Sequence, residues 1–225
     1  MMQAGSPSVE EGGRASNVDP TSLLALRRRL ERAELIADRA FDTIYPDDVR
    51  RASSVHWTPV EVAMRIMELL ELERNATLLD IGAGVGKFCI VARAVARHVH
   101  VRGVEHRPRF VEIANRAAAT VGVDVDVRLG GLRDVDPKSV DALYLFNPFA
   151  ENLADWPDQL DASVELGRDR YRRDVRAMEQ LLARARNGTR LVTYCGWGGV
   201  VPDDYHLIRR ESCAGRIEIW RKSGR

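Results

Sequence analysis

The sequence contains few of the residues that would indicate a metal site, a disulfide framework or a membrane span. Its three cysteines, Cys89, Cys195 and Cys213, lie far apart in 225 residues. This spacing excludes a Cys-x-x-Cys metal site and gives no basis for a set of disulfides. No apolar run approaches the roughly 18 residues of a membrane helix, and the N-terminus lacks an apolar signal core. We therefore expect a cytoplasmic protein with reduced thiols, no metal and no membrane partner.

The sequence also lacks an excess of charge of either sign. Lysine and arginine number 34 against 33 acidic residues, so the formal net charge of +1 gives no global preference for nucleic acid or membrane. The length suits one domain with a sizeable core. Residues 1–20, rich in glycine, serine, proline and charge, predict a disordered tail. We expect a helical, cofactor-covering extension at 21–57 and the main domain at 58–225.

Glycine is present where it carries information. An apolar run at 77–81 contains Asp80 and is followed by the alternating residues Gly82, Gly84 and Gly86, then by a helical pattern over 88–97. This order predicts a strand, a tight turn and the N-terminus of a helix. Glycines at such a turn let a ligand approach the backbone, and the helix N-terminus offers it free N–H groups.

The spacing of the glycines separates the ligand classes that use such a turn. A Walker phosphate loop needs a glycine where Ile81 stands and Ser or Thr where Phe88 follows Lys87. A dinucleotide fingerprint needs a third glycine where Lys87 stands. The remaining pattern is acid-x-Gly-x-Gly-x-Gly. A turn that binds no ligand stays open as the alternative.

This pattern resembles motif I of the class I S-adenosylmethionine-dependent methyltransferases. The resemblance implies that the glycines approach the amino-acid part of the cofactor and that Asp80 fixes its ammonium group. Glu105 ends the next predicted strand about 20 residues on, where nucleoside-binding sheets place an acid for the ribose hydroxyls. The further cofactor contacts expected are Trp57, Thr58, Ala83, His106, Leu132 and Asn147. S-adenosyl-L-homocysteine would be the product.

The adenine end departs from the family pattern. The turn after the predicted strand 123–129 commonly carries an acid for the adenine amino group, and here Gly131 occupies that position. The contact must then come from backbone, from Asp134, or from nothing.

Periodicity predicts the rest of the fold. Strands are expected at 77–81, 99–105, 123–129, 140–146 and 189–195, followed by an antiparallel pair at 205–210 and 216–220. Helices are expected as one amphipathic stripe from Leu23 to Ile44, from a Thr58 N-cap to Leu70, from Pro108, and over about 162–185. We predict an α/β fold with a Rossmann-like, doubly wound seven-stranded sheet. It is mostly parallel, with a terminal antiparallel β-hairpin and helices on both faces.

A second motif follows the fourth predicted strand. Asn147, Pro148 and Phe149 resemble the Asn-Pro-Pro-aromatic motif of enzymes that methylate amino nitrogens, with one proline missing. In that family the asparagine accepts from the substrate N–H groups and the aromatic ring stacks on the substrate. The resemblance implies that these three residues border the transferring methyl group. A plain turn at the strand end is the alternative.

Further candidates lie in predicted loops. His56 and Trp57 precede a helix, Glu151 is a candidate base or a solvated acid, and Trp197 is a candidate lid or a packed ring. The arginines of residues 168–176 predict a solvated face, with contact to an anionic substrate as the alternative.

Three functions remain open. The first is transfer of a methyl group to a nitrogen, or less readily an oxygen, of an unidentified small molecule, protein or RNA. The second is a Rossmann NAD(P)-dependent oxidoreductase, disfavoured by Lys87 and the terminal hairpin. The third is a non-catalytic protein that binds S-adenosylmethionine and uses its arginine-rich helices as a scaffold.

Overall fold

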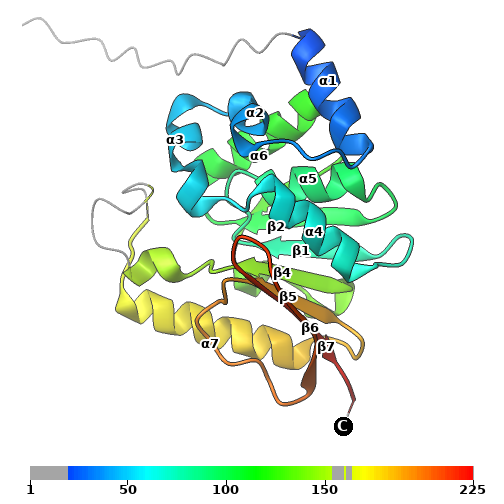
Figure 1. Cartoon of the computed structure of the whole chain (residues 1–225). Helices are drawn as coiled ribbons and strands as arrows, with labels where there is room; N and C mark the ends of the chain where they lie inside the picture. Colours follow the sequence, from blue (N-terminus) through cyan, green and yellow to red (C-terminus); the bar gives the residue numbers. More distant parts are fainter. Residues whose placement is uncertain (1–19, 154–159, 161–163, 225) are drawn as a thin grey trace, which may run out of the picture.

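A seven-stranded sheet forms the centre of the protein (Figure 1). The computed structural model describes residues 20–153, 160 and 164–224. The strand order is β3-β2-β1-β4-β5-β7-β6; β1 to β5 are parallel, whereas β7 runs antiparallel to β5 and β6. The predicted mixed sheet with its terminal hairpin is confirmed. Its strands are β1 Thr77–Ile81, β2 His100–Glu105, β3 Asp126–Leu129, β4 Ala142–Phe146, β5 Arg190–Tyr194, β6 Tyr205–Ser212 and β7 Arg216–Lys222.

Helices cover both faces of the sheet. On one face α4 packs on α5, and α1 packs on α5 and α6; on the other face α7 packs against η2, η3 and η4 (Figure 1). The helical elements are α1 Pro20–Glu31, α2 Asp38–Phe41, η1 Asp42–Ile44, α3 Asp47–His56, α4 Val60–Leu70, α5 Lys87–Val95, α6 Pro108–Val121, η2 Leu132–Asp134, η3 Pro137–Ser139, η4 Ala150–Leu153 and α7 Arg168–Arg184.

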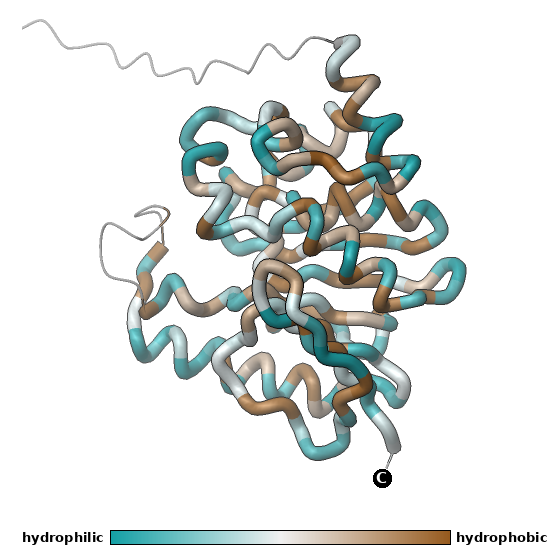
Figure 2. Tube along the Cα trace, in the orientation of Figure 1, coloured by the Kyte–Doolittle hydropathy of each residue, from teal (hydrophilic) through white to brown (hydrophobic). Residues whose placement is uncertain are grey.

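Strand β4 shows how the two layers share the sheet. Ala142 and Tyr144 belong to the hydrophobic cluster beneath α1 to α6, whereas Leu143 and Leu145 belong to the cluster beneath α7. Successive side chains of a strand point to opposite faces, so a strand buried on both sides reads as a continuous apolar run. Figure 2 shows this hydrophobic colouring in the central strands.

The topology fixes where a ligand should bind. Strands β1 and β4 are adjacent, and the chain proceeds from β1 outward to β3 on one side and from β4 to β5 on the other. A crevice forms outside the carboxyl ends of such a pair, where open α/β sheets bind their ligands. The glycine turn and residues 147–149 both follow these strand ends.

The N-terminal helix differs from the prediction. The stripe from Leu23 to Ile44 predicted one helix, but α1 ends at Glu31. Ala33 adopts a left-handed backbone with φ of 53°. The N–H of Glu34 bonds to the carbonyl of Arg29 and that of Ala33 to Leu30, each at 2.9 Å. This closure satisfies the last carbonyls and ends the helix. The predicted disordered tail lies outside the described residues, except for Pro20, where α1 begins.

The segment before α4 is also more ordered than predicted. His56 was expected in a loop, but it ends α3, which begins at two acids favoured at a helix N-terminus, Asp47 and Asp48. Thr58 was expected to cap α4; the N-cap position is Pro59, and the N–H of Val60 bonds instead to Asp38 Oδ1 at 2.9 Å.

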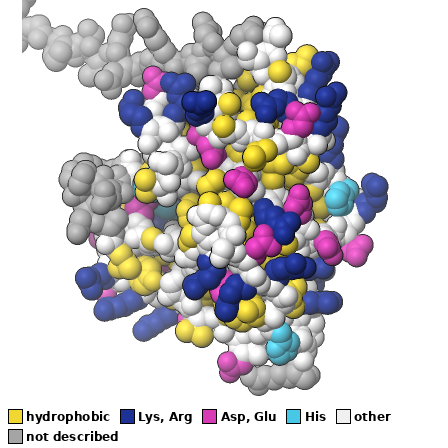
Figure 3. Space-filling view, viewed as in Figure 1, with side chains coloured by type: hydrophobic (Ala, Val, Ile, Leu, Met, Phe, Trp, Pro, Cys, Tyr) yellow, Lys and Arg dark blue, Asp and Glu magenta, His cyan; other side chains and the backbone are white. Residues whose placement is uncertain are grey.

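Helix α7 begins later than predicted. A start near residue 162 was expected, but the helix begins at Arg168. Gly167 has φ of 157° and ψ of 168°, an extended conformation on the glycine-favoured side that prevents helix before it. Lysine and arginine side chains gather over α7 (Figure 3). In the part of the chain that the structure describes, no helix is long and apolar enough to cross a bilayer.

Candidate cofactor site

The turn between β1 and α5 has a backbone that only glycine adopts readily. Gly82, Gly84 and Gly86 have φ of 73°, 53° and 74°. A Cβ atom on Gly84 would lie 2.4 Å from the Trp57 ring, and one on Gly82 would lie 2.9 Å from Pro148 Cβ. The alternating glycines are therefore required by both conformation and space.

Glu105, at the carboxyl end of β2, faces this turn. Its Oε2 accepts from the Gly84 N–H at 3.0 Å, and its Oε1 accepts from the N–H groups of His106 and Arg107, each at 2.9 Å. Burial raises the pKa of Glu105, while these hydrogen bonds and the charge of Arg107 oppose the increase. The carboxylate is thus held in place beside the glycines.

Three adjoining cavities follow the strand ends. The largest, about 390 Å³, is lined by Glu105, Trp57 and Asn147 among others. A cavity of about 30 Å³ contains Asp80 and shares Gly82 and Trp57 with it. A third, of about 90 Å³, is lined by Leu132 and shares Gly82 and His106 with the largest. We name them the ribose cavity, the methionine cavity and the adenine cavity for the parts of a nucleoside–amino acid conjugate that they would accept.

Comparison with known proteins agrees with this geometry. Residues 25–136 match the profile of the protein-L-isoaspartate(D-aspartate) O-methyltransferase family. The chain is 27% identical over 163 residues to tuberculostearic acid methyltransferase UfaA1 of Mycobacterium tuberculosis, a match that covers 68% of this chain but only 38% of that protein. The chain belongs to the class I S-adenosylmethionine-dependent methyltransferases.

Solved structures agree on the fold. An RNA methyltransferase from Salinibacter ruber in complex with S-adenosyl-L-homocysteine superposes with a TM-score of 0.54 at 21% identity, over 75% of this chain and 94% of that one. MtNAS in complex with S-adenosylmethionine superposes with a TM-score of 0.54 at 16% identity, over 89% and 73% of the two chains. The cofactor of the present methyltransferase is S-adenosylmethionine, and the bare glycine backbone and Glu105 fit it.

Asp80 lines the methionine cavity of the methyltransferase and is 4% exposed. Burial raises the pKa of Asp80 to about 7, opposed by a hydrogen bond from Cys89 Sγ at 3.4 Å and reinforced by the charge of Glu105. The carboxyl group is therefore half protonated near neutral pH in the ligand-free protein. A cationic partner would favour its ionised form.

We expect the affinity for S-adenosylhomocysteine to fall as the pH drops from 8 to 6. Below a pKa of about 7 a proton competes with the ligand ammonium for Asp80, so the dissociation constant should rise by up to about tenfold per pH unit. Calorimetric titration across this range measures the effect. Burial lowers the pKa of His106 to about 4, so His106 does not titrate in this window.

The Asp80→Asn variant is the control for this titration. It should bind more weakly at pH 8 and lose most of the pH dependence, whereas Glu105 remains unchanged in it. An equally steep dependence in Asp80→Asn would show that another group titrates.

Trp57 covers the glycine turn. Its ring is 8% exposed, packs edge-on to Phe110 with centroids 5.6 Å apart, and donates from Nε1 to the Val49 carbonyl at 3.2 Å. Thr58 Oγ1 lies 2.7 Å from the Tyr144 hydroxyl. Both residues and His56 line the methionine cavity, so this predicted segment does lie beside the cofactor site.

The three residues of the second motif do not share one environment. Asn147 is exposed, has φ of 39° and lines the ribose cavity with Pro148. Phe149 is 6% exposed in the cluster beneath α7 and lines the adenine cavity instead. The predicted stacking of Phe149 on an acceptor does not agree with this burial. Phe146, which the sequence reading missed, is half-buried and lines the ribose and methionine cavities.

Glu151 and Trp197 have structural contacts. Glu151 Oε2 accepts from Arg107 Nη2 at 2.8 Å, and its Oε1 accepts from the Leu160 N–H at 2.7 Å. Trp197 is 3% exposed in the cluster beneath α7, so it is a packed ring and the lid interpretation is wrong. Glu151 joins η4 to β2's end and has no free oxygen for a base.

Lys87 is a feature that the sequence reading missed. It follows the last glycine and is only 2% exposed. Its Nζ lies 2.6 Å from Asp38 Oδ1, 2.7 Å from Asp42 Oδ1 and 3.0 Å from Ser53 Oγ. This lysine joins the glycine turn to α2, η1 and α3.

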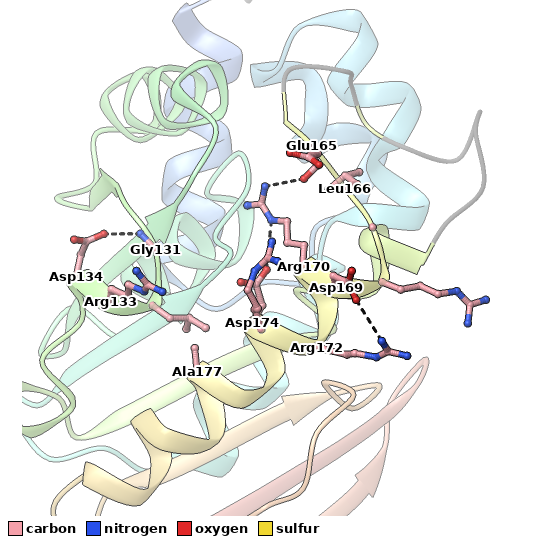
Figure 4. Close-up of a pocket in the computed structure, with 14 residues that line it drawn as sticks. Gly131, Arg133, Asp134, Glu165, Leu166, Asp169, Arg170, Arg172, Asp174 and Ala177 are labelled. Atoms are coloured by element: carbon pink, nitrogen blue, oxygen red, sulfur yellow. Dashed lines mark hydrogen bonds and ion pairs between the residues drawn. The ribbon is translucent and has the colours of Figure 1, made fainter.

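A wider pocket of about 810 Å³ lies between η2 and the first turns of α7 (Figure 4). Its arginines are partly neutralised by neighbouring acids: Arg170 Nε lies 3.5 Å from Asp174 and Arg172 Nη1 lies 3.3 Å from Asp169. Asp134 accepts from the Gly131 N–H at 2.8 Å. These pairs agree with a solvated, mixed-charge face. Among the described residues no cluster of His, Cys, Asp and Glu suited to a metal is found.

Proposed function

We propose that this methyltransferase transfers a methyl group to a nitrogen atom of its acceptor. The observation that carries the proposal is the position of Asn147. It follows β4, it is exposed, and it lines the ribose cavity beside Gly82 and Glu105. An acceptor that enters this cavity therefore meets an amide next to the cofactor.

The chemistry that this residue supplies is orientation. An amide oxygen accepts a hydrogen bond from an acceptor N–H and thereby turns the nitrogen lone pair away from itself. S-adenosylmethionine, when bound, supplies an electrophilic methyl group on a sulfonium. Alignment of a reacting pair contributes several kcal/mol to lowering a barrier, and no metal is needed for it.

The backbone supports the same role. Asn147 has φ of 39°, a left-handed conformation that asparagine tolerates better than most residues, and its N–H bonds to the Gly196 carbonyl at 3.1 Å. This bond joins the ends of β4 and β5. Phe146, directly before it, offers a half-buried ring in the same cavity.

An oxygen acceptor is the second candidate. The matched family is named for O-methyl transfer, but that match ends at residue 136, before Asn147. It therefore concerns the cofactor half of the chain. The RNA methyltransferase similarity is likewise one of fold, at 21% identity. Small molecules, proteins and RNA all remain acceptor classes to be tested.

The experiment uses S-adenosylmethionine with a radioactive methyl group. The purified protein is incubated with separate pools of RNA, protein and small metabolites, and the labelled product is treated with mild base. An N-methyl product keeps its label, whereas a methyl ester releases methanol. Release of the label would favour the oxygen acceptor. Labelling of no pool, with intact cofactor binding, would favour the non-catalytic scaffold.

Asn147→Gly is expected to reduce turnover by about 100-fold while leaving the affinity for S-adenosylhomocysteine within about twofold. Glycine keeps the left-handed backbone, so this variant removes the amide without adding strain. Initial rates with the labelled acceptor and calorimetry with S-adenosylhomocysteine separate the two effects. Equal losses in both measurements would contradict the division of roles between Asn147 and the glycine turn.

A further inference from the structure

The adenine cavity lacks the acid expected at its rim. Gly131 stands where the family pattern places it, and a Cβ built on Gly131 meets no atom within 4 Å. Asp134 does not take its place, because its Oδ2 accepts from the Gly131 N–H at 2.8 Å and the residue lines the wider arginine pocket. The adenine amino group, a donor of two hydrogen bonds, therefore needs an acceptor from elsewhere.

Asn152 in η4 supplies an acceptor. The residue is 9% exposed and lines the adenine cavity together with Leu132, Gly131 and Phe149. Its Nδ2 donates to the Phe149 carbonyl at 3.1 Å. Its Oδ1 is buried and has no hydrogen-bond partner among the described residues. Buried polar atoms in native proteins are nearly always paired, so this atom calls for a ligand.

The orientation of the amide follows from its fixed contact. The Phe149 carbonyl only accepts hydrogen bonds, so the nitrogen of the Asn152 amide must face it. The oxygen is then the atom left over. Asn152 presents an acceptor, and no donor competes with it at that position.

We propose that Asn152 Oδ1 accepts a hydrogen bond from the 6-amino group of the cofactor adenine and so selects adenine over bases without this donor. The recognition comes from η4, after β4, instead of from the turn after β3. Binding then pairs an atom that is unsatisfied in the ligand-free protein. The selection is strong because a base without the amino group leaves the oxygen buried and unpaired.

Two other groups of the cavity are less suited to this contact. Asp174 lies 3.5 Å from Arg170 Nε, and its side chain is 32% exposed, so it is paired and open to water. His106 Nδ1 lies 3.1 Å from Glu105 Oε1, and its Nε2 is also unpaired. However, His106 lines the ribose cavity as well and directly follows the predicted ribose ligand. It therefore serves as the comparison in the test.

The test measures binding of S-adenosylhomocysteine and of S-inosylhomocysteine, in which a carbonyl oxygen replaces the amino group. The full chain should prefer the adenosyl compound by about tenfold to 100-fold, because the inosyl oxygen would face Oδ1. Asn152→Leu should reduce this ratio to within about threefold of unity. The ratio is formed within one protein preparation, so it does not depend on the fraction that is folded.

Two variants complete the experiment. Asn115→Leu removes another asparagine amide that bonds to backbone, at Val127 and far from the adenine cavity, and should keep the wild-type ratio. His106→Phe keeps a ring but removes its nitrogen atoms, and should also keep a preference of at least about tenfold. An unchanged ratio in Asn152→Leu, or loss of preference in His106→Phe alone, would overturn the assignment. Equal weak binding of both ligands to the wild-type chain would also overturn it.

Discussion

Gly84→Val is expected to abolish measurable binding of S-adenosylhomocysteine and to lower the thermal stability of the protein. Gly84 has φ of 53°, which a β-branched residue resists, and its N–H is bonded to Glu105. A side chain would also start 2.4 Å from the Trp57 ring. The two consequences have separate physical causes, namely strain with Trp57 and obstruction of the ligand. Calorimetry and thermal unfolding measure them separately.

A pair of further variants distinguishes these causes. Gly84→Ala combined with Trp57→Ala removes the clash with the ring while keeping a Cβ in the ligand's path. We expect the double variant to unfold at a higher temperature than Gly84→Ala alone, yet to bind at least about tenfold more weakly than Trp57→Ala alone. Binding equal to that of Trp57→Ala would show that Gly84 is needed only for packing.

Lys87→Met is expected to lower the free energy of unfolding by about 3–5 kcal/mol, the usual result when one partner of a buried ion pair is removed. Asp42, whose side chain is 7% exposed, would be left without its cation. For a domain of this size the melting temperature should fall by about 6–20 °C. Thermal and urea unfolding of the full chain measure the loss.

The double variant Lys87→Met with Asp42→Asn is the control. Asparagine removes the unpaired charge, so much of the lost stability should return. A melting temperature for Lys87→Met equal to that of the wild type would show that the contacts of Lys87 do not stabilise the fold. Full loss in the double variant would assign the effect to packing of the lysine side chain instead of its charge.

The sheet could be predicted because its signals are local. Apolar runs flanked by turn residues identified all seven strands, and the alternating glycines located the cofactor turn. Asp80 and Glu105 were placed correctly at strand ends, since the carboxyl ends of parallel strands meet at one edge. The end of α1 was not predictable from hydrophobic spacing, because the stripe continues past Ala33 although the backbone there is left-handed.

The environments of individual side chains depended on contacts between distant segments. Trp197 and Phe149 lie in glycine- and proline-containing turns, yet both rings are buried because α7 packs over them. Thr58 has the residue type of a helix cap, but Asp38 from α2 caps α4 and Thr58 bonds to Tyr144. Asn152 gave no signal in the sequence, since its importance comes from one unpaired oxygen in a cavity.

The contacts of Lys87 bear on where this protein can be cut. A boundary at residue 58 separates the predicted extension from the predicted main domain, but Asp38, Asp42 and Ser53 all lie on the far side of it from Lys87. A fragment that begins at Thr58 would keep a lysine designed for burial and lose every one of these oxygens. The smallest independently folding unit of this chain therefore includes α2 and α3, and gene-shortening or domain-swapping experiments should place their junction before Asp38.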